Sequence, residues 1–368
     1  MPIRSRFSRR RVPSLVLLLA AMLITSAQAA GAATPLPNGG SVSGVIVTTG
    51  QDSYEFTATA GDHIELRSPS DVSIATSSDS GVAKIAHDVT ETGTFTVLVD
   101  DGVSVGGSYT LYFALIPGAN EHGSLTNGGV HPGTIDLGDL DTYTFTASAG
   151  DHIELRVGEN GSATLAPQLS LYAPSGALID TGTDAVAAKV AHDAVESGTF
   201  TVLVRDGASA PRGFGDYNLY FALIPGANEH GLLTPGVAQP GTIDLGDLDT
   251  FTLVATTGET ISLELQKTSG TGSGQLELYD PAGALVDSAT STGTASFDHL
   301  VAGPGTYTVL VKDGGAAPRG SGDYILTYTT DAPAVPSMSL SMLLLLAVAI
   351  AWGGIRGVAS TAHHNAAG

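Results

Sequence analysis

Leu111-Tyr-Phe-Ala-Leu-Ile-Pro-Gly-Ala-Asn-Glu-His-Gly123 occurs a second time, unchanged, as Leu219 to Gly231. This stretch belongs to a longer module that the chain uses three times. The second copy opens at Gly133 with Gly-Thr-Ile-Asp-Leu-Gly-Asp-Leu-Asp-Thr, and the third copy opens with the same run at Gly241. A module that is repeated in this way argues against a single catalytic centre.

Hydrophobic residues inside each module recur with a period of two. Tyr143, Phe145 and Ala147 alternate with threonines, and Ile153 and Leu155 alternate with His, Glu and Arg. Because successive side chains of a strand point to opposite faces, the pattern predicts strands with one buried face and one solvent face, and the threonines suit the solvent face. Turn residues separate about eight such strands per module, and no long helix is expected.

The sequence therefore predicts an all-β fold of three tandem jelly-roll or Greek-key β-sandwiches. We place the modules at 41–118, 130–226 and 238–330, each large enough to bury its own core, like beads on a string. The first module is shortened: it has no counterpart of Leu169–Leu178, which the third module keeps as Leu276–Leu285. We expect it to lose two strands. The joints, Ile116–Gly123 and Ile224–Gly231, begin with a Pro-Gly break and are polar enough for the surface.

The N-terminal segment 1–29 has the features of a secretory signal peptide. Five arginines precede the apolar run Leu15–Ile24, and Ala27 and Ala29 form an A-x-A cleavage site. We expect this segment to lie outside the fold and to engage the general secretion machinery. The run Ser8–Arg10 leaves a twin-arginine signal as an alternative.

The C-terminal end has a second targeting pattern. A proline-containing linker at 331–337 leads to an apolar segment at 338–354, which has about the minimum length of a transmembrane helix, and a tail at 355–368 follows. The segment is predicted to be a hydrophobic helix that serves as a membrane anchor or as a processed sorting signal. Arg356 favours a cytoplasmic end.

Composition narrows the classes of function. The chain has no cysteine, so disulfides, thiolate metal sites and cysteine nucleophiles are excluded. All 36 acidic residues follow the signal peptide, together with only ten of the 15 Lys and Arg residues. Such an acidic protein repels nucleic acid and anionic lipid, and it attracts cations.

These motifs resemble two known families. The order G-T-I-D-L-G-D-L-D-T, A-G-D-H-I-E-L, L-x-L-Y-x-P-x-G, E-S-G-T-F-T-V-L-V and G-D-Y, within 41–328, is similar to the bacterial pre-peptidase C-terminal domain. That resemblance implies a jelly-roll accessory domain of secreted or surface proteins and not a catalyst. Val335, Pro336 and Ser339 resemble an IPTL-type sorting signal of Gram-negative bacteria. This implies processing by an exosortase-like protease. The positions of Ser337, Met338 and Ser341 depart from that motif.

Three aspartates per module are candidate metal ligands. They are Asp136, Asp139 and Asp141 in the second module and Asp244, Asp247 and Asp249 in the third. Loop carboxylates are typical calcium ligands. The alternative is that they are turn aspartates that accept hydrogen bonds from their own backbone. Calcium is the one cofactor that the sequence suggests.

Catalytic patterns are weak. His–Asp pairs recur at His63, His87, His152 and His192, but no nucleophile elbow and no H-E-x-x-H motif accompanies them. We therefore predict that the protein is not an enzyme. The pairs Tyr112–Phe113 and Tyr220–Phe221 each split across a strand, so one exposed ring per pair is a candidate for stacking on sugar.

Two functions remain open from the sequence. The first is a non-enzymatic exported protein of the cell envelope or extracellular space, acting as a spacer, adhesion or matrix module with a cell-surface glycan or protein as partner. The second is a calcium- or carbohydrate-binding accessory module of a secreted hydrolase system.

Overall fold

The structure is a computed structural model that describes residues 5–6, 33–47, 50–64, 82–100, 106–161, 164–208 and 213–331. The prediction of an all-β fold is confirmed, and the described residues contain no helix. Accordingly, these residues include no helix that could span a membrane. Ala27, Ala29, Val335, Pro336, Ser339 and the apolar segment 338–354 lie outside the described residues.

The middle module is a sandwich of two four-stranded antiparallel sheets, ordered β10-β15-β12-β13 and β14-β11-β16-β9. The chain crosses between the sheets at every connection except the β12–β13 hairpin. Its strands are β9 (Gly129–Ile135), β10 (Asp141–Ala147), β11 (His152–Glu159), β12 (Pro167–Tyr172), β13 (Leu178–Thr183), β14 (Ala187–Asp193), β15 (Gly198–Asp206) and β16 (Gly215–Ile224).

The third module repeats this topology, with sheets β18-β23-β20-β21 and β17-β24-β19-β22. Its strands are β17 (Gln239–Ile243), β18 (Leu248–Ala255), β19 (Thr260–Lys267), β20 (Gly274–Tyr279), β21 (Leu285–Ser291), β22 (Thr294–Leu300), β23 (Gly305–Asp313) and β24 (Gly322–Asp331). Each module has its own core of inward-facing residues. Phe145 and Phe200, paired across β10 and β15, stack at 5.4 Å between ring centroids in the middle core.

The first module is reduced, and its described residues form no counterpart of the β12–β13 hairpin. One layer has the order β1-β7-β4-β2, and the other contains the pairs β3–β8 and β5–β6. Its strands are β1 (Ser5–Arg6), β2 (Thr34–Pro35), β3 (Gly40–Ile46), β4 (Gln51–Ala58), β5 (His63–Ile64), β6 (His87–Asp88), β7 (Gly93–Asp100) and β8 (Gly107–Phe113).

One strand departs from the expectation for the N-terminal segment. Ser5–Arg6 lies within the segment 1–29, which was expected outside the fold, yet it pairs in parallel with Val99–Asp100 of β7. In the middle module the corresponding edge, that of β15, is paired with β12. The short strand therefore occupies an edge that the missing hairpin leaves open.

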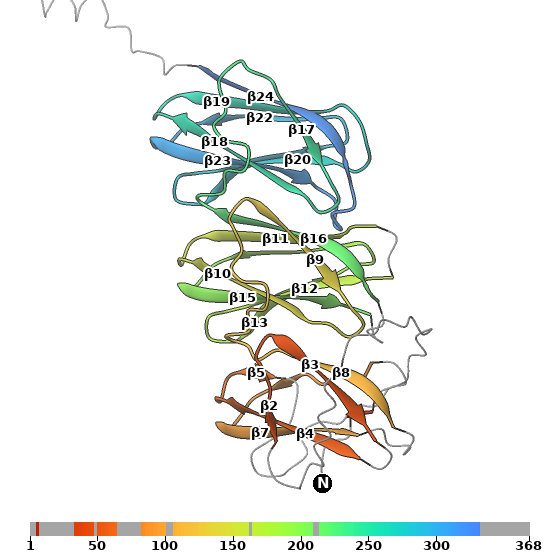
Figure 1. The fold of residues 1–368 in the computed structure, drawn as a ribbon. Coiled ribbons are helices and arrows are strands. Elements are labelled where there is room, and N and C mark those ends of the chain that lie inside the picture. The colour runs from red at the N-terminus through yellow and green to blue at the C-terminus, as the bar shows by residue number, and fades with distance from the viewer. Residues whose placement is uncertain are drawn as a thin grey trace, which may run out of the picture.

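The modules are stacked face to face rather than joined as separate beads (Figure 1). The sheet that contains β11 and β16 packs on the sheet of the third module that contains β20 and β23. Tyr220, Ala222 and Ile224 meet Leu248, Tyr279 and Leu310 there in a buried apolar cluster. A second cluster, Ala114, Ile116, Ala119, Tyr172 and Leu203, joins the first two modules. The expectation of separate beads is wrong because a buried apolar cluster joins each module to the next.

Stacking also corrects the expected solvent faces. Thr142, Thr201 and Thr250 are at most 1% exposed, and the charged residues Glu154 and Arg156 are 2% and 0% exposed. The period of two marks alternating faces correctly. The sequence pattern assigns the polar face to water, however, whereas in a stack that face packs against the neighbouring module.

Candidate functional site at the module joints

A buried aspartate begins β10 and lies where the first joint meets the middle module. Asp141 is 1% exposed, and its Oδ2 accepts a hydrogen bond of 2.5 Å from the Tyr217 hydroxyl, which is also 2.7 Å from the Tyr143 hydroxyl. Tyr217 can reach Asp141 because its ring lies over Gly133, where a Cβ would be 2.3 Å from the ring. The Gly of the repeated Gly-Thr-Ile-Asp run therefore has a packing role.

The other oxygen of Asp141 faces the joint. Its Oδ1 is 3.1 Å from Nε2 of His122, whose ring stacks on Tyr143 at 5.1 Å. The joint backbone is fixed beside it: the amide of Glu121 donates to Thr142 Oγ1 at 2.9 Å, and the amide of His122 donates to the Thr142 carbonyl at 3.0 Å. One donor atom each of Glu121, His122 and Asp141 lies within 4.8 Å of the others. We call these three residues the joint-1 triad.

The second joint repeats this arrangement. Glu229, His230 and Asp249 form the joint-2 triad, again with donor atoms within 4.8 Å of one another. Nε2 of His230 is 2.9 Å from Asp249 Oδ1, and the Tyr324 hydroxyl donates to the other oxygen of Asp249. Phe251 replaces Tyr143 under the histidine, with the rings stacked at 5.0 Å.

The remaining predicted ligands lie in the turn before β10 and its counterpart before β18. The carboxylate of Asp139 accepts the amide of Leu140 at 2.8 Å, and that of Asp247 accepts the amide of Leu248 at 2.8 Å. Burial, followed by the charge of Asp141, raises the pKa of Asp139 to about 6. Burial and Asp249 raise the pKa of Asp247 to about 7. Asp136 and Asp244 contribute backbone groups to these turns, so the structure brings only Asp141 and Asp249 into the triads.

Four residues of the triads were not predicted from the sequence: Glu121, His122, Glu229 and His230. The signal available was the exact repetition of Asn-Glu-His-Gly in both joints. The alternation pattern gave no reason to connect this tetrapeptide with an aspartate that follows it by about one strand and one turn.

The His–Asp pairs are parts of the module interfaces. Nδ1 of His63 is 2.5 Å from Asp88, and Nδ1 of His152 is 2.6 Å from Asp193, across the β5–β6 and β11–β14 pairs. Each ring packs on a tyrosine of the following module: His63 on Tyr172 and His152 on Tyr279. In the described part of the chain neither ring is hydrogen-bonded to a serine or threonine hydroxyl, so no activated nucleophile is assembled.

A buried ion-pair network joins the second and third modules. Glu154 Oε1 accepts from Arg156 at 2.9 Å, and Glu154 Oε2 accepts from Lys312 Nζ at 2.6 Å. Lys312 also contacts Glu277 at 2.8 Å, and Tyr279 donates to Glu277 at 2.7 Å. Two cations and two anions balance, as buried charges require. Burial acts to raise the pKa of Glu154, but Arg156 and Lys312 outweigh it and hold that pKa well below 4.5.

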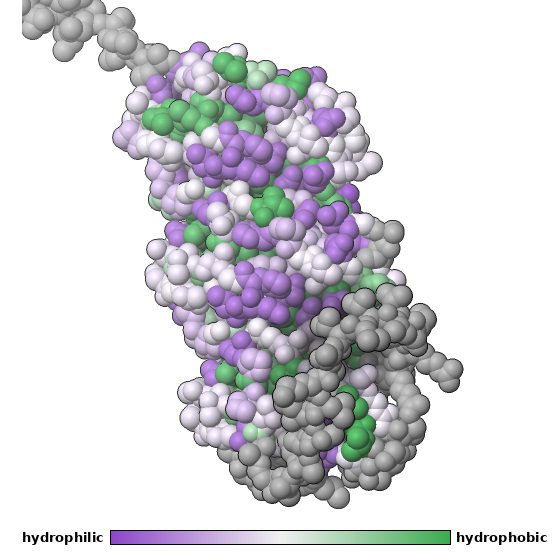
Figure 2. Space-filling view, in the orientation of Figure 1, coloured by the Kyte–Doolittle hydropathy of each residue, from purple (hydrophilic) through white to green (hydrophobic). Residues whose placement is uncertain are grey.

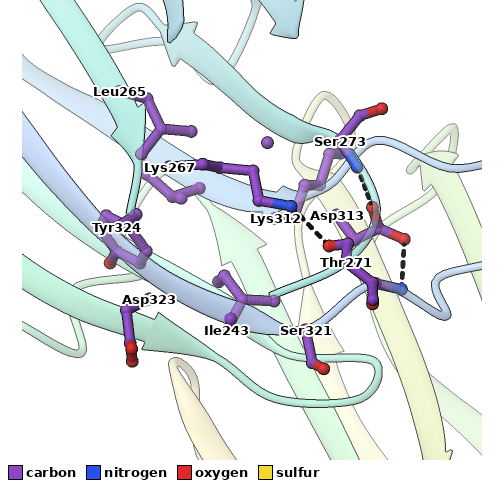
Figure 3. A pocket seen from close by; sticks show the side chains of 14 residues that line it. Ile243, Leu265, Lys267, Thr271, Ser273, Lys312, Asp313, Ser321, Asp323 and Tyr324 are labelled. Atoms are coloured by element: carbon purple, nitrogen blue, oxygen red, sulfur yellow. Dashed lines mark hydrogen bonds between the residues drawn. The ribbon is translucent and has the colours of Figure 1, made fainter. Parts of the chain in front are cut away.

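Two cavities among the described residues have linings whose groups already contact one another. The crevice in Figure 3 encloses about 20 Å³, room for about one water. Its polar groups bind one another: Asp313 accepts the amides of Ser273 and Gly320, and Lys267 donates to the Thr271 carbonyl. An open groove of about 470 Å³ beside β2 and β4 is lined by Phe56 and Phe113, whose rings belong to the core of the first module.

The proposed sugar-stacking rings also have other contacts. Tyr220 and Phe221 are 4% and 2% exposed, so the expectation that one ring of this pair is exposed is wrong. Tyr220 packs in the interface between modules, which a strand pattern read within one module cannot reveal. Phe113 is buried, and Tyr112 is half-buried beside the turn that holds Asp136 and Asp139.

No family model matches the sequence, and no curated protein matches it. Among solved structures, a pre-peptidase C-terminal domain of a collagenase from Bacillus anthracis is similar over 27% of this chain and 93% of that chain, with 17% identity and a TM-score of 0.24. A CUB1-EGF-CUB2 fragment of human MASP-1/3 is similar over 54% of this chain and 99% of that chain, with 8% identity and a TM-score of 0.18. Tripeptidyl peptidase 2 is similar over 81% of this chain and 32% of that chain, with 10% identity and a TM-score of 0.20. The first of these is a domain of the type that the sequence motifs resemble, while the fold itself is defined by the strand order described above.

Proposed function

We propose that this protein is a non-catalytic, exported stalk of the bacterial cell surface, built from three modules of pre-peptidase C-terminal type. One observation supports the proposal of a rigid stack: a buried apolar cluster crosses each module boundary, and a buried ion-pair network also crosses the boundary between the second and third modules. A rigid stack sets a fixed distance between whatever its two ends hold. This is the property that a spacer or an adhesion stalk requires.

Delivery and attachment form the second half of the proposal. The general secretion machinery would recognise the segment that ends at Ala29, and an exosortase-like protease would process the tail near Val335, Pro336 and Ser339. On the face shown in Figure 2, hydrophilic side chains run along the stack with apolar residues between them. Scattered apolar residues are ordinary on a soluble surface.

Two measurements test the two halves separately. Small-angle X-ray scattering from the purified exported protein should give the profile of a compact, elongated particle. A profile of mutually mobile beads would contradict the stalk. Mass spectrometry of protein from envelope and medium should find N-termini just after Ala29 and C-termini between Val335 and Met338. Finding Gly368 still attached in the envelope would contradict processing.

A further inference from the structure

Hydrogen bonds within the protein do not satisfy every polar group of the two triads. Each contains one imidazole and two carboxylates, and the described residues provide no hydrogen-bond partner for the carboxylate of Glu121. The electrostatic neighbours of Glu121 are Asp139, Asp141 and His122, and those of Glu229 are His230 and Asp249, so among the described residues no lysine or arginine offsets either carboxylate. Each joint therefore holds concentrated negative charge beside a single imidazole.

The geometry of the triads suits one small cation. Two ligands of a tetrahedral ion with bonds of about 2.0–2.2 Å lie about 3.3 Å apart. The Nε2–Oδ1 separations of 3.1 Å for His122 and Asp141 and of 2.9 Å for His230 and Asp249 are hydrogen-bond distances, and they are also close to this value, so an ion can take the place of the shared proton with little movement of either side chain. The glutamate is exposed, so its side chain can rotate to complete the set, whereas the aspartate and the joint backbone are already fixed.

We propose that each joint binds one divalent transition-metal ion of the zinc class, through Glu121, His122 and Asp141 at the first joint and Glu229, His230 and Asp249 at the second. The imidazole decides the class of metal, because calcium takes oxygen ligands whereas zinc accepts imidazole together with carboxylate. Three protein ligands leave the fourth position for water. Each ion would link a joint to the second strand of the next module, β10 or β18.

The two triads recur together with the repeated sequence of the modules. The triads occupy equivalent positions of successive modules, and both have the same residue types, the same backbone anchors on a threonine and the same stacking of the histidine on an aromatic ring. Because both triads come from the repeated sequence, the same geometric argument applies to both joints. The proposal does not depend on the stalk function, because it concerns binding and not rigidity.

Isothermal titration of the untagged exported protein with Zn²⁺ tests the proposal. We expect two ions per chain in the parent protein, one in H122Q, one in H230Q and none in H122Q/H230Q. E121Q/E229Q, which alters only exposed side chains, should also lose both ions. Circular dichroism and melting of each variant would show that it is folded.

The matched control removes charge from the same region without removing a proposed ligand. D136N/D244N should keep both ions. Binding that is absent in the parent protein, that survives in both folded double variants or that disappears equally in D136N/D244N would overturn the proposal. A parallel titration with Ca²⁺ separates the classes of metal: two calcium ions in place of zinc would refute the transition-metal assignment.

Discussion

At the scale of single residues, Lys312 is the centre of the interface between the second and third modules. Its ammonium is 2.6 Å from Glu154 and 2.8 Å from Glu277, and the three residues are at most 6% exposed. Removing one partner of a buried ion pair leaves an uncompensated charge. We expect Lys312→Ala to lower the free energy of unfolding by about 3–5 kcal/mol in urea titrations.

A second cation across the same interface provides the control. Arg319 donates to both carboxylate oxygens of Asp184, at 2.8 and 2.6 Å. The Arg319 side chain, however, is 53% exposed. Because solvent screens such a pair, Arg319→Ala should leave the urea midpoint nearly unchanged. Equal losses in the two variants would show that burial is not what makes the Lys312 network matter.

His152 gives the interface a dependence on pH. Burial acts to lower its pKa, but Glu154 and Asp193 outweigh burial and raise the pKa above 6.5. Because the folded pKa lies above the unfolded value, the stabilisation is fully present below pH 6.5 and is lost as the pH rises through the folded pKa. The melting temperature should therefore fall as the pH is raised from about 6.5, and H152Q should flatten this part of the profile. A steep decline that persists in H152Q would assign it to another group.

At the scale of elements, the β12–β13 hairpin contributes to the contact between the first two modules. Its turn fits against the preceding joint: a Cβ on Gly176 would be 2.8 Å from Pro117 Cδ and 3.2 Å from the carbonyl oxygens of Gly61 and Ile116. In the third module Gly283 meets Pro225 in the same way. In both modules the hairpin turn therefore docks the module on the one before it.

A glycine substitution tests this docking role. Gly176→Ala should loosen the contact between the first two modules, because the added methyl meets Pro117. Gly150→Ala is the matched control. Gly150 also has a positive φ, +100° compared with +88° for Gly176, but no atom lies within 4 Å of a Cβ added to Gly150. Spin labels in the first and second modules should report a broader distance distribution for Gly176→Ala than for Gly150→Ala. Equal widths would mean that backbone strain, and not docking, is the cause.

The strands themselves follow from the sequence better than the site does. Alternation located β10, β11 and β15, because the period of two is a local property of the backbone. It could not tell that Thr142 and Arg156 are buried, since the atoms that cover them belong to another module. For the same reason Asp141 was identified as a candidate ligand, whereas Glu121 and His122 were seen only as a polar joint. Their proximity to Asp141 depends on how a joint folds back on the next module.

At the scale of the whole molecule, the upper end of the stack lacks the docking residues of the interior. Thr327, Thr329 and Asp331 occupy the register positions at which β16 has Tyr220, Ala222 and Ile224. These replacements remove the apolar face that holds the next module, as a terminal repeat requires. We expect sedimentation velocity to find no end-to-end association over a wide concentration range. Growth of linear oligomers would contradict this.

The most direct test of the rigid stack is a distance measured from end to end. The chain has no cysteine, so spin labels on T57C and T329C, both exposed and in the outermost sheets, report one distance. Five sheet spacings of about 10 Å place these sheets on the order of 50 Å apart. Pulsed electron resonance should give a single narrow distance peak near that value, and a broad distribution would show that the modules move independently and contradict the account.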